Sequence, residues 1–224
     1  MILVHHLENS RSQRILWLLE ELGLPYEVKL YERNKKTMLA PASLKEVHPL
    51  GRSPVITDGK ETVAESGAII EYLLEKYGKG RLQPAVGTPE ARRFRFWLHY
   101  AEGSAMPPLL IKMVFDQVEK KAPFFVKPVA LAISQGVKLS FLSAEVKNHL
   151  EYMEKELSSR PWFAGEEFSA ADIQMSFPLE AAAGRAGLKS SYPKMAAFLE
   201  KIHARPAYQA ALKKGGPFDM GAMG

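Results

Sequence analysis

The feature that most restricts the fold of this chain is a change of pattern near residue 80. Before it, strand and helix signals alternate. Ile2–Val4 and Tyr26–Tyr31 have the short apolar or alternating pattern of strands, and the apolar positions between residues 15 and 22 recur at helical spacing until Gly23. After residue 88 the spacing is helical throughout, and no segment predicts a strand.

The rest of the first half predicts a hairpin and a second helix. Lys45–Pro49 lies in a polar connection, and Pro54–Thr57 and Glu61–Ala64 flank Asp58-Gly59, a pair suited to a tight turn. From Glu65 the apolar positions return to helical spacing until Gly78. The predicted order is therefore β-α-β-(α)-β-β-α.

The second half predicts a helical bundle behind an exposed linker. The helical segments are 89–115 with a disturbance at Pro107-Pro108, 126–158 in one or two pieces, 169–186, and 193–213 broken near Pro206. The predicted fold class is α/β plus all-α, with one domain at 1–80, a linker at 81–88 and an all-helical domain at 89–224. Residues 215–224 are expected to form a loosely packed tail.

Ser53-Pro54 stands directly before a predicted strand, where proline is unusual because it has no N–H to donate. If this bond is cis, the Val55 backbone N–H and C=O point outward and can pair with an extended peptide. The alternative is a trans proline that begins an edge strand.

Glu65-Ser66 opens a helix, where free N–H groups and the positive helix end favour a bound carboxylate. The Ser66 hydroxyl adds a donor, and Glu65 can pair with an ammonium group. Together they suit the two charged ends of an amino acid. Taken alone, Ser66 is equally explained as a helix cap.

Ser10 lies between the first strand and the first helix, where a helix N-terminus favours an anionic sulfur. Ser10-x-x-Gln13 also matches a capping box, and Asn9 or Ser12 can serve as the cap instead. A second capping sequence, Ser169-x-x-Asp172, is interpreted as purely structural.

Composition excludes several kinds of site. The chain has no cysteine, so any thiol must come with a ligand, and its six histidines show no metal-ligand spacing. The net charge of +5 is carried by scattered basic pairs, which predicts no nucleic-acid partner. No phosphate-binding or nucleophile-elbow motif occurs.

The chain shows neither a signal-peptide pattern nor ~20 uninterrupted apolar residues. We therefore expect no transmembrane segment and a cytoplasmic protein.

Four segments in order resemble the cytosolic-type glutathione transferases over nearly the whole chain: SRSQRILWLLEELGLPYE, HPLGRSPVI, AESGAIIEYLLEKYG and FSAADIQMSFPL. The similarity is greatest to the bacterial and fungal subgroup that includes the yeast membrane-associated glutathione transferase, through YAEGSAMPPLL and AEVKNHLEYMEKEL. The resemblance implies a thioredoxin-like first domain, glutathione as co-substrate and a homodimer.

The resemblance also implies roles for particular residues. Val55 would pair with the cysteinyl backbone of glutathione, and Glu65 and Ser66 would hold its γ-glutamyl end. Arg52 and His48 would reach its glycine carboxylate, and Ser53 is a further glutathione-binding residue. The family activates the sulfur with Tyr, Ser or Cys, and here Ser10 is the best hydroxyl, although Asn9 falls at the usual position. Asn9 could donate its amide to a thiolate, as could Ser12 or Arg11 from neighbouring positions. A small hydrophobic electrophile would lie between the domains, with a candidate wall of Tyr100, Glu102, Met106, Pro107 and Phe115.

Three functions follow from this interpretation. The first is conjugation of glutathione to a small electrophile. The second is a glutathione-dependent peroxidase or disulfide-bond reductase. The third is a non-catalytic scaffold of the same fold, because a fold does not fix a function.

Overall fold

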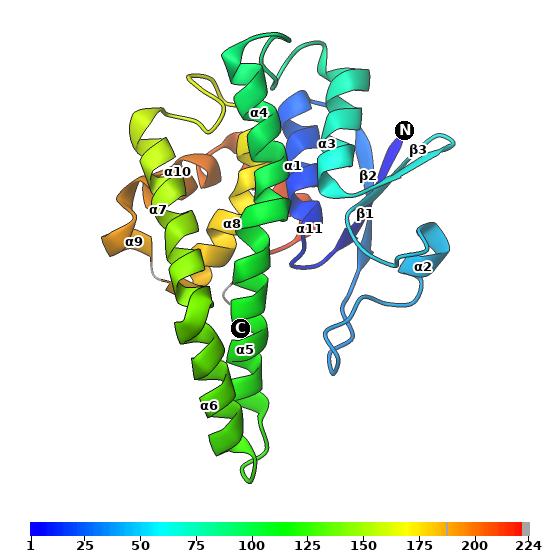
Figure 1. Ribbon diagram of the computed structural model, residues 1–224. Coiled ribbons are helices and arrows are strands. Elements are labelled where there is room, and N and C mark those ends of the chain that lie inside the picture. The colour runs from blue at the N-terminus through cyan, green and yellow to red at the C-terminus, as the bar shows by residue number, and fades with distance from the viewer. Residues whose placement is uncertain (187, 221–224) are drawn as a thin grey trace.

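A four-stranded sheet forms the first half of the molecule in a computed structural model, which describes residues 1–186 and 188–220 (Figure 1). The strands are β1 (Ile2–Leu7), β2 (Tyr26–Tyr31), β3 (Val55–Asp58) and β4 (Glu61–Ala64), in the spatial order β2-β1-β3-β4. β1 runs parallel to β2 and antiparallel to β3, and β3 runs antiparallel to β4. This mixed sheet is that of a thioredoxin-like domain, so the predicted fold of the first half is confirmed.

The hairpin β3–β4 forms where the sequence predicts it, with a turn one residue later. Asp58 pairs with Glu61, so the two turn residues are Gly59 and Lys60, and Gly59 has φ +64°. Asp58 is instead a strand residue whose carboxylate accepts from Tyr72, Lys76 and Tyr77. These three donors lower the pKa of Asp58 to about 2, with the Lys76 ammonium as the largest cause.

Helices complete both halves, as the sequence predicts. The first half holds α1 (Ser12–Leu22), the short α2 (Leu44–Val47) and α3 (Ser66–Leu73). The second half holds α4 (Pro89–Tyr100), α5 (Met106–Lys121), α6 (Lys127–Val137), α7 (Ser143–Ser159), α8 (Ala170–Ala186), α9 (Leu188–Ser191), α10 (Pro193–His203) and α11 (Pro206–Gly215). The disturbance predicted at Pro107 lies just before it, as a π-helical turn at Ala101–Ala105.

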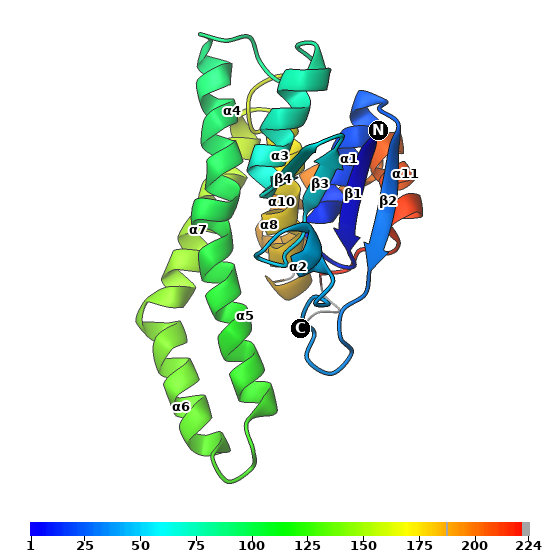
Figure 2. The ribbon, with the colours of Figure 1, turned by 90° about the vertical axis from the view of Figure 1, so that its right-hand side faces the viewer.

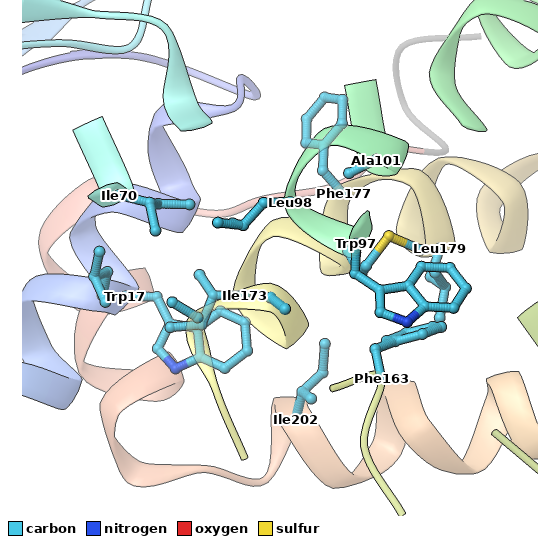
Figure 3. Close-up of a cluster of buried hydrophobic side chains, with 14 of the residues drawn as sticks. Trp17, Ile70, Trp97, Leu98, Ala101, Phe163, Ile173, Phe177, Leu179 and Ile202 are labelled. Atoms are coloured by element: carbon cyan, nitrogen blue, oxygen red, sulfur yellow. The ribbon is translucent and has the colours of Figure 1, made fainter. Parts of the chain in front are cut away.

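One continuous core joins the two halves, and α8 lies within it (Figure 3). Ile173 and Leu179 of α8 are fully buried among side chains from both halves, including Trp17 of α1 and Trp97 of α4. Trp97 also packs against Phe163, with ring centroids 4.6 Å apart. The two halves are therefore held together by apolar packing and not only by their linker.

The end of the described chain returns to the first half. Helix α11 packs on α1, and Tyr208 lies edge-on against Trp17 with ring centroids 5.1 Å apart. A Cβ on Gly215 would lie 2.5 Å from the side chain of Leu16, so a larger residue here would force that buried side chain to shift. Within the predicted loosely packed tail, Gly215 and Met220 are buried while Pro217 and Asp219 are exposed, and residues 221–224 lie outside the described residues.

One helical stretch among the described residues, Lys127–Ser159, is long and apolar enough by length and composition to cross a membrane. Its most apolar 18-residue window has a mean hydropathy of 1.3, and 11% of that window is buried. A single stretch of this kind is weak support for a membrane span, so the expectation of no transmembrane segment stays a prediction. The stretch does show that the second half carries exposed apolar side chains.

Candidate functional site

A cavity of about 850 Å³ lies where the two halves meet. That volume is within the range of small-molecule sites. Its walls come from the β1–α1 turn, the loop before β3, the start of α3, and the helices α5 and α8. The predicted residues on its wall are Asn9, Ser10, His48, Arg52, Ser53, Glu65, Ser66, Glu102 and Met106.

The loop before β3 enters the cavity wall through a cis peptide bond between Ser53 and Pro54. The Ser53 hydroxyl donates to the His5 carbonyl at 2.9 Å and accepts from the Leu7 N–H at 3.3 Å, so it fastens this loop to β1. Val55 lies behind the wall, with its side chain 1% exposed and in register with His5 and Ala64. The pairing of its backbone with a ligand stays a prediction.

The start of α3 places two predicted residues side by side on the wall. Glu65 has φ +72° and ψ +123°, and its exposed side chain faces the cavity. Ser66 is buried, and its Oγ accepts from Arg14 Nη2 at 3.1 Å and from Gln174 Nε2 at 3.4 Å. An Oγ that already accepts twice has its own hydrogen left to donate.

His48 and Arg52 lie on the same wall near the cis bond. His48 Nδ1 accepts from the Leu50 N–H at 3.4 Å, which leaves Nε2 as the protonated nitrogen of the neutral ring. Arg52 is exposed, and its side chain forms no hydrogen bond or ion pair with any of the described residues. Both side chains are therefore positioned to donate to an anionic group.

The β1–α1 turn brings Asn9 and Ser10 to the cavity, but the predicted capping box does not form. The Ser10 hydroxyl lies 2.7 Å from the Ser12 hydroxyl and 3.3 Å from the Ser12 N–H. The Gln13 side chain is buried without a partner among the described residues. Asn9 has φ +46°, and its Oδ1 accepts from the Asp219 N–H at 2.9 Å.

A partly buried ion cluster at the cavity wall is the largest feature that the sequence did not reveal. Arg14 is 2% exposed and donates to the Gln174 carbonyl, to Ser66 and to Glu102. Glu102 also accepts from Arg11 Nε. Burial acts to raise the pKa of Glu102, but the charges of Arg14 and Arg11 outweigh it and lower that pKa. Glu102 is therefore a carboxylate between two guanidinium groups.

Three residues of the predicted wall for the electrophile lie outside this cavity. Tyr100, Pro107 and Phe115 are not among the cavity-lining residues. The Tyr100 hydroxyl bonds to His149, Pro107 is exposed, and the Phe115 carbonyl accepts from Ser134.

The helical phase of α5 explains why Pro107 and Phe115 lie outside the cavity. One face of the helix lines the cavity through positions 4, 3, 4 and 4 residues apart, which are Met106, Leu110, Met113, Gln117 and Lys121. The sequence shows the helix but not which face turns inward. Phe177 of α8 completes the apolar part of the wall and was also missed.

A metal site has no support in the parts of the chain that are described. Residues 1–186 and 188–220 contain no group of three or more potential His or carboxylate ligands.

Two family models match this chain. The glutathione S-transferase N-terminal domain matches residues 1–75, and the glutathione S-transferase C-terminal domain matches residues 140–206. The chain belongs to the glutathione S-transferase family. The predicted family and the predicted glutathione transferase function are therefore confirmed, and neither alternative function has better support.

Individual glutathione S-transferases are similar to this chain over nearly its full length. The chain is 37% identical to glutathione S-transferase 3 of Schizosaccharomyces pombe over 96% of this chain and 88% of that protein. It is 34% identical to glutathione S-transferase 1 of Saccharomyces cerevisiae, over 96% of this chain and 95% of that protein. A glutathione S-transferase structure from Actinobacillus pleuropneumoniae superposes with a TM-score of 0.80 at 33% identity, over 97% of this chain and 94% of that one.

Proposed function

We propose that this glutathione transferase binds glutathione along the wall formed by the cis-Pro54 loop and the start of α3, and conjugates it to a small hydrophobic electrophile. The observation that carries the binding mode is the hydrogen-bonding state of Ser66. Because its Oγ accepts from Arg14 and Gln174, its hydroxyl hydrogen is available to a carboxylate in the cavity. The Arg14 charge further favours an anion there.

Both ends of the peptide have complementary groups. At the γ-glutamyl end, Glu65 offers a carboxylate to the α-ammonium beside Ser66, and at the other end Arg52 and His48 offer donors to the glycine carboxylate. Val55 is proposed to pair with the cysteinyl backbone, and Ser53 to hold the loop in place. A zwitterionic, extended tripeptide matches this order of charges.

The chemistry proceeds through the glutathione thiolate. A free thiol has a pKa near ~8.5, so lowering it by ~2 units requires about 2.7 kcal/mol of preferential thiolate stabilisation. The β1–α1 turn, with Ser10 and Asn9 as the candidates predicted from the sequence, lines the same cavity as Pro54. The sulfur then forms a bond to the electrophilic carbon, and the leaving group departs with its electron pair.

The electrophile is proposed to occupy the apolar side of the same cavity. Met106, Leu110 and Met113 of α5 and Phe177 of α8 supply that side. Flexible methionine side chains and one aromatic ring suit small apolar molecules of differing shape. Detoxification of such electrophiles in the cytoplasm is the role that we propose, and a cysteine-free chain requires no oxidising compartment.

Removing the Ser66 hydroxyl or the Glu65 carboxylate should weaken glutathione binding. We expect Ser66→Ala and Glu65→Ala each to raise the Kd about 10-fold to 100-fold, because a hydrogen bond or ion pair to a charged group is worth about 1.5–3 kcal/mol. Isothermal titration calorimetry measures this directly. Glu61→Ala, which removes an exposed carboxylate at the far end of β4, is the matched control.

The outcome also separates the alternative functions. Loss of binding in both variants, with turnover of aryl halides by the wild type, supports the transferase. Turnover of peroxides or mixed disulfides alone would favour the peroxidase or reductase. Absence of both heat and thermal stabilisation at millimolar glutathione would overturn the proposed site and leave the scaffold.

We also propose that the chain forms a homodimer through the hairpin of α5 and α6. This hairpin extends beyond the rest of the molecule in both views (Figures 1 and 2). It exposes a series of large apolar side chains, and exposed apolar surface of this extent is typical of protein interfaces. They include Val114, Val118, Phe124, Phe125, Val129 and Ile133.

Charges at the hairpin tip should disrupt this dimer. Phe124 and Phe125 are 89% and 72% exposed, so the double variant Phe124→Asp/Phe125→Asp should fold normally while shifting the sedimentation coefficient from dimer to monomer. Val86→Asp, at an equally exposed apolar residue of the linker, is the control and should remain dimeric. A wild type that sediments as a monomer at high concentration would contradict the proposal.

A further inference from the structure

Three side chains in sequence, Asn9, Ser10 and Arg11, reach the cavity from the β1–α1 turn. Each carries a group that can donate to a sulfur anion. Their hydrogen bonds with the rest of the protein differ, and these bonds determine which donor remains available to a ligand.

The Ser10 hydroxyl is the last member of a hydrogen-bonded chain that begins at the C-terminal end of α11. His6 Nε2 lies 2.9 Å from the Gly215 carbonyl, His6 Nδ1 lies 2.8 Å from Ser12 Oγ, and Ser12 Oγ lies 2.7 Å from Ser10 Oγ. A carbonyl only accepts, so His6 Nε2 carries the hydrogen and Nδ1 of the neutral ring is an acceptor. Ser12 Oγ also lies 3.3 Å from the Leu7 carbonyl, but its 2.8 Å contact with an acceptor nitrogen of His6 requires a hydrogen between the two atoms, and only Ser12 can supply it. Ser12 therefore donates mainly to His6, and Ser10 donates to Ser12.

The His6 ring is neutral for a physical reason. It is 2% exposed, and burial lowers its pKa more than the bond to the Gly215 carbonyl raises it. The direction of the chain of hydrogen bonds is therefore fixed at neutral pH. Since the hydrogen of Ser10 points toward Ser12, it does not point toward a sulfur in the cavity.

Both oxygen atoms of Asn9, in the side chain and in the backbone, accept hydrogen bonds from other residues. Its Oδ1 accepts from the Asp219 N–H at 2.9 Å, and its carbonyl accepts from Arg33 Nη2 at 3.4 Å. The amide nitrogen remains as a donor, but it is uncharged and stabilises a thiolate less than a cation does.

Arg11 is the charged donor of the turn. Its Nε donates to both oxygens of Glu102, at 2.8 and 2.9 Å, and its guanidinium carbon lies 4.5 Å from the centre of the Phe177 ring. The side chain is 34% exposed, and its two terminal nitrogens form no hydrogen bond or ion pair with residues 1–186 or 188–220. Glu102 and Phe177 thus fix the guanidinium while leaving its outer N–H groups to the cavity.

The charges around this guanidinium also favour an anion. Arg11, Arg14 and Glu102 together carry a net charge of +1 in a partly buried position. The remaining charged groups on the cavity wall are Arg33, Arg52, Glu65 and Lys121. The carboxylate of Glu65 is at the proposed γ-glutamyl end, so cations predominate around the rest of the cavity.

We propose that Arg11 is the catalytic residue that stabilises the glutathione thiolate, with Glu102 as its positioning residue. This inference rests on the proposed glutathione site. The thiol proton leaves to solvent, the sulfur anion lies against the outer N–H groups of Arg11, and the thiolate then forms the carbon–sulfur bond as the leaving group departs.

The test measures the pKa of the thiol of bound glutathione. The ultraviolet absorbance of the thiolate in the glutathione complex is recorded across a pH series, and the pKa is taken from that titration. An opposite charge within about 4–6 Å lowers a pKa by about 1–3 units, so Arg11→Ala should raise the thiol pKa by that amount. Arg11→Lys should restore part of the shift, because it keeps the charge but loses the bond geometry to Glu102. Ser10→Ala should give a smaller rise than Arg11→Ala.

Two further variants make the result decisive. Arg92→Ala removes the same charge from an exposed position on α4 and should leave the thiol pKa unchanged. Arg11→Gln retains a donor for Glu102, so it serves if Arg11→Ala does not fold. An unchanged thiol pKa in a folded Arg11 variant, or a larger rise in Ser10→Ala, would overturn the role of Arg11. Failure of the wild type to bind glutathione in calorimetry would instead overturn the proposed site.

Discussion

Replacing Arg14 with methionine should lower the free energy of unfolding by about 3 kcal/mol, because the change leaves buried polar groups without their partner. Arg14 is 2% exposed, and its guanidinium joins the Gln174 carbonyl, Ser66 and Glu102. Methionine fills much of the volume but donates to none of them. Urea denaturation at pH 7 measures the loss.

The same variant should also weaken glutathione binding about 10-fold or more, because the Ser66 hydroxyl loses the donor that orients it. A stability effect alone would not change the affinity of the folded protein, so calorimetry below the unfolding transition separates the two. Arg95→Met, at an exposed position of α4, should alter the free energy of unfolding by less than about 0.5 kcal/mol.

A double-mutant cycle with Glu102→Gln identifies the source of the Arg14 effect. If the two residues stabilise the fold through their ion pair, the double variant should lose less than the sum of the single variants. Strict additivity would show that the Arg14–Glu102 pair contributes no coupling energy to folding. An Arg14→Met protein as stable as the wild type would show that Arg14 contributes nothing to the stability of the fold. Arg11 remains bound to Glu102 in Arg14→Met, which limits the loss.

The parts of the site that the sequence reveals are those encoded by neighbouring residues. Ser53-Pro54 and Glu65-Ser66 are adjacent pairs next to a strand or a helix, so local signals are enough to place them on one wall. The helix start at Ser169 is equally local, and the structure confirms it through the bonds from Ser169 to Asp172.

What the sequence does not reveal depends on contacts between distant segments. Arg14 looks like an ordinary helix residue until α1 packs against Glu102, which lies 88 positions later. The orientation of the Ser10 hydroxyl depends on Gly215 through His6 and Ser12, and no local pattern relates these positions. The inward face of α5 is likewise set by packing, because several of its turns have apolar residues on more than one side.

Asp172→Ala should destabilise the protein by about 2–4 kcal/mol at pH 7, because it leaves two buried backbone N–H groups without an acceptor. The Asp172 carboxylate accepts from the Phe163 N–H and the Ser169 N–H, both at 2.8 Å, and from the Ser169 hydroxyl at 3.0 Å. These bonds join the start of α8 to the preceding loop. Glu151→Ala, at an exposed surface pair, should cost less than about 0.5 kcal/mol.

The cost of Asp172→Ala should grow as the pH falls. Burial raises the pKa of Asp172 to about 6 from an ordinary value of 3.8, so between these values the folded state binds a proton that the unfolded state does not. Proton uptake by the folded state stabilises it as the pH decreases through that window. The wild type should therefore gain about 1.4 kcal/mol over the alanine variant between pH 7 and pH 5.

Comparing the wild type with Asp172→Ala separates the effect of Asp172 on stability from the effects of other titrating groups. Burial lowers the pKa values of His5 and His6, so both histidines destabilise the fold as the pH falls through 6.5, but they do so equally in the wild type and the variant. Urea denaturation of both proteins at pH 7 and pH 5 measures the difference. A cost that shrinks at pH 5 would mean that the three hydrogen bonds outweigh burial and hold the pKa of Asp172 below its ordinary value.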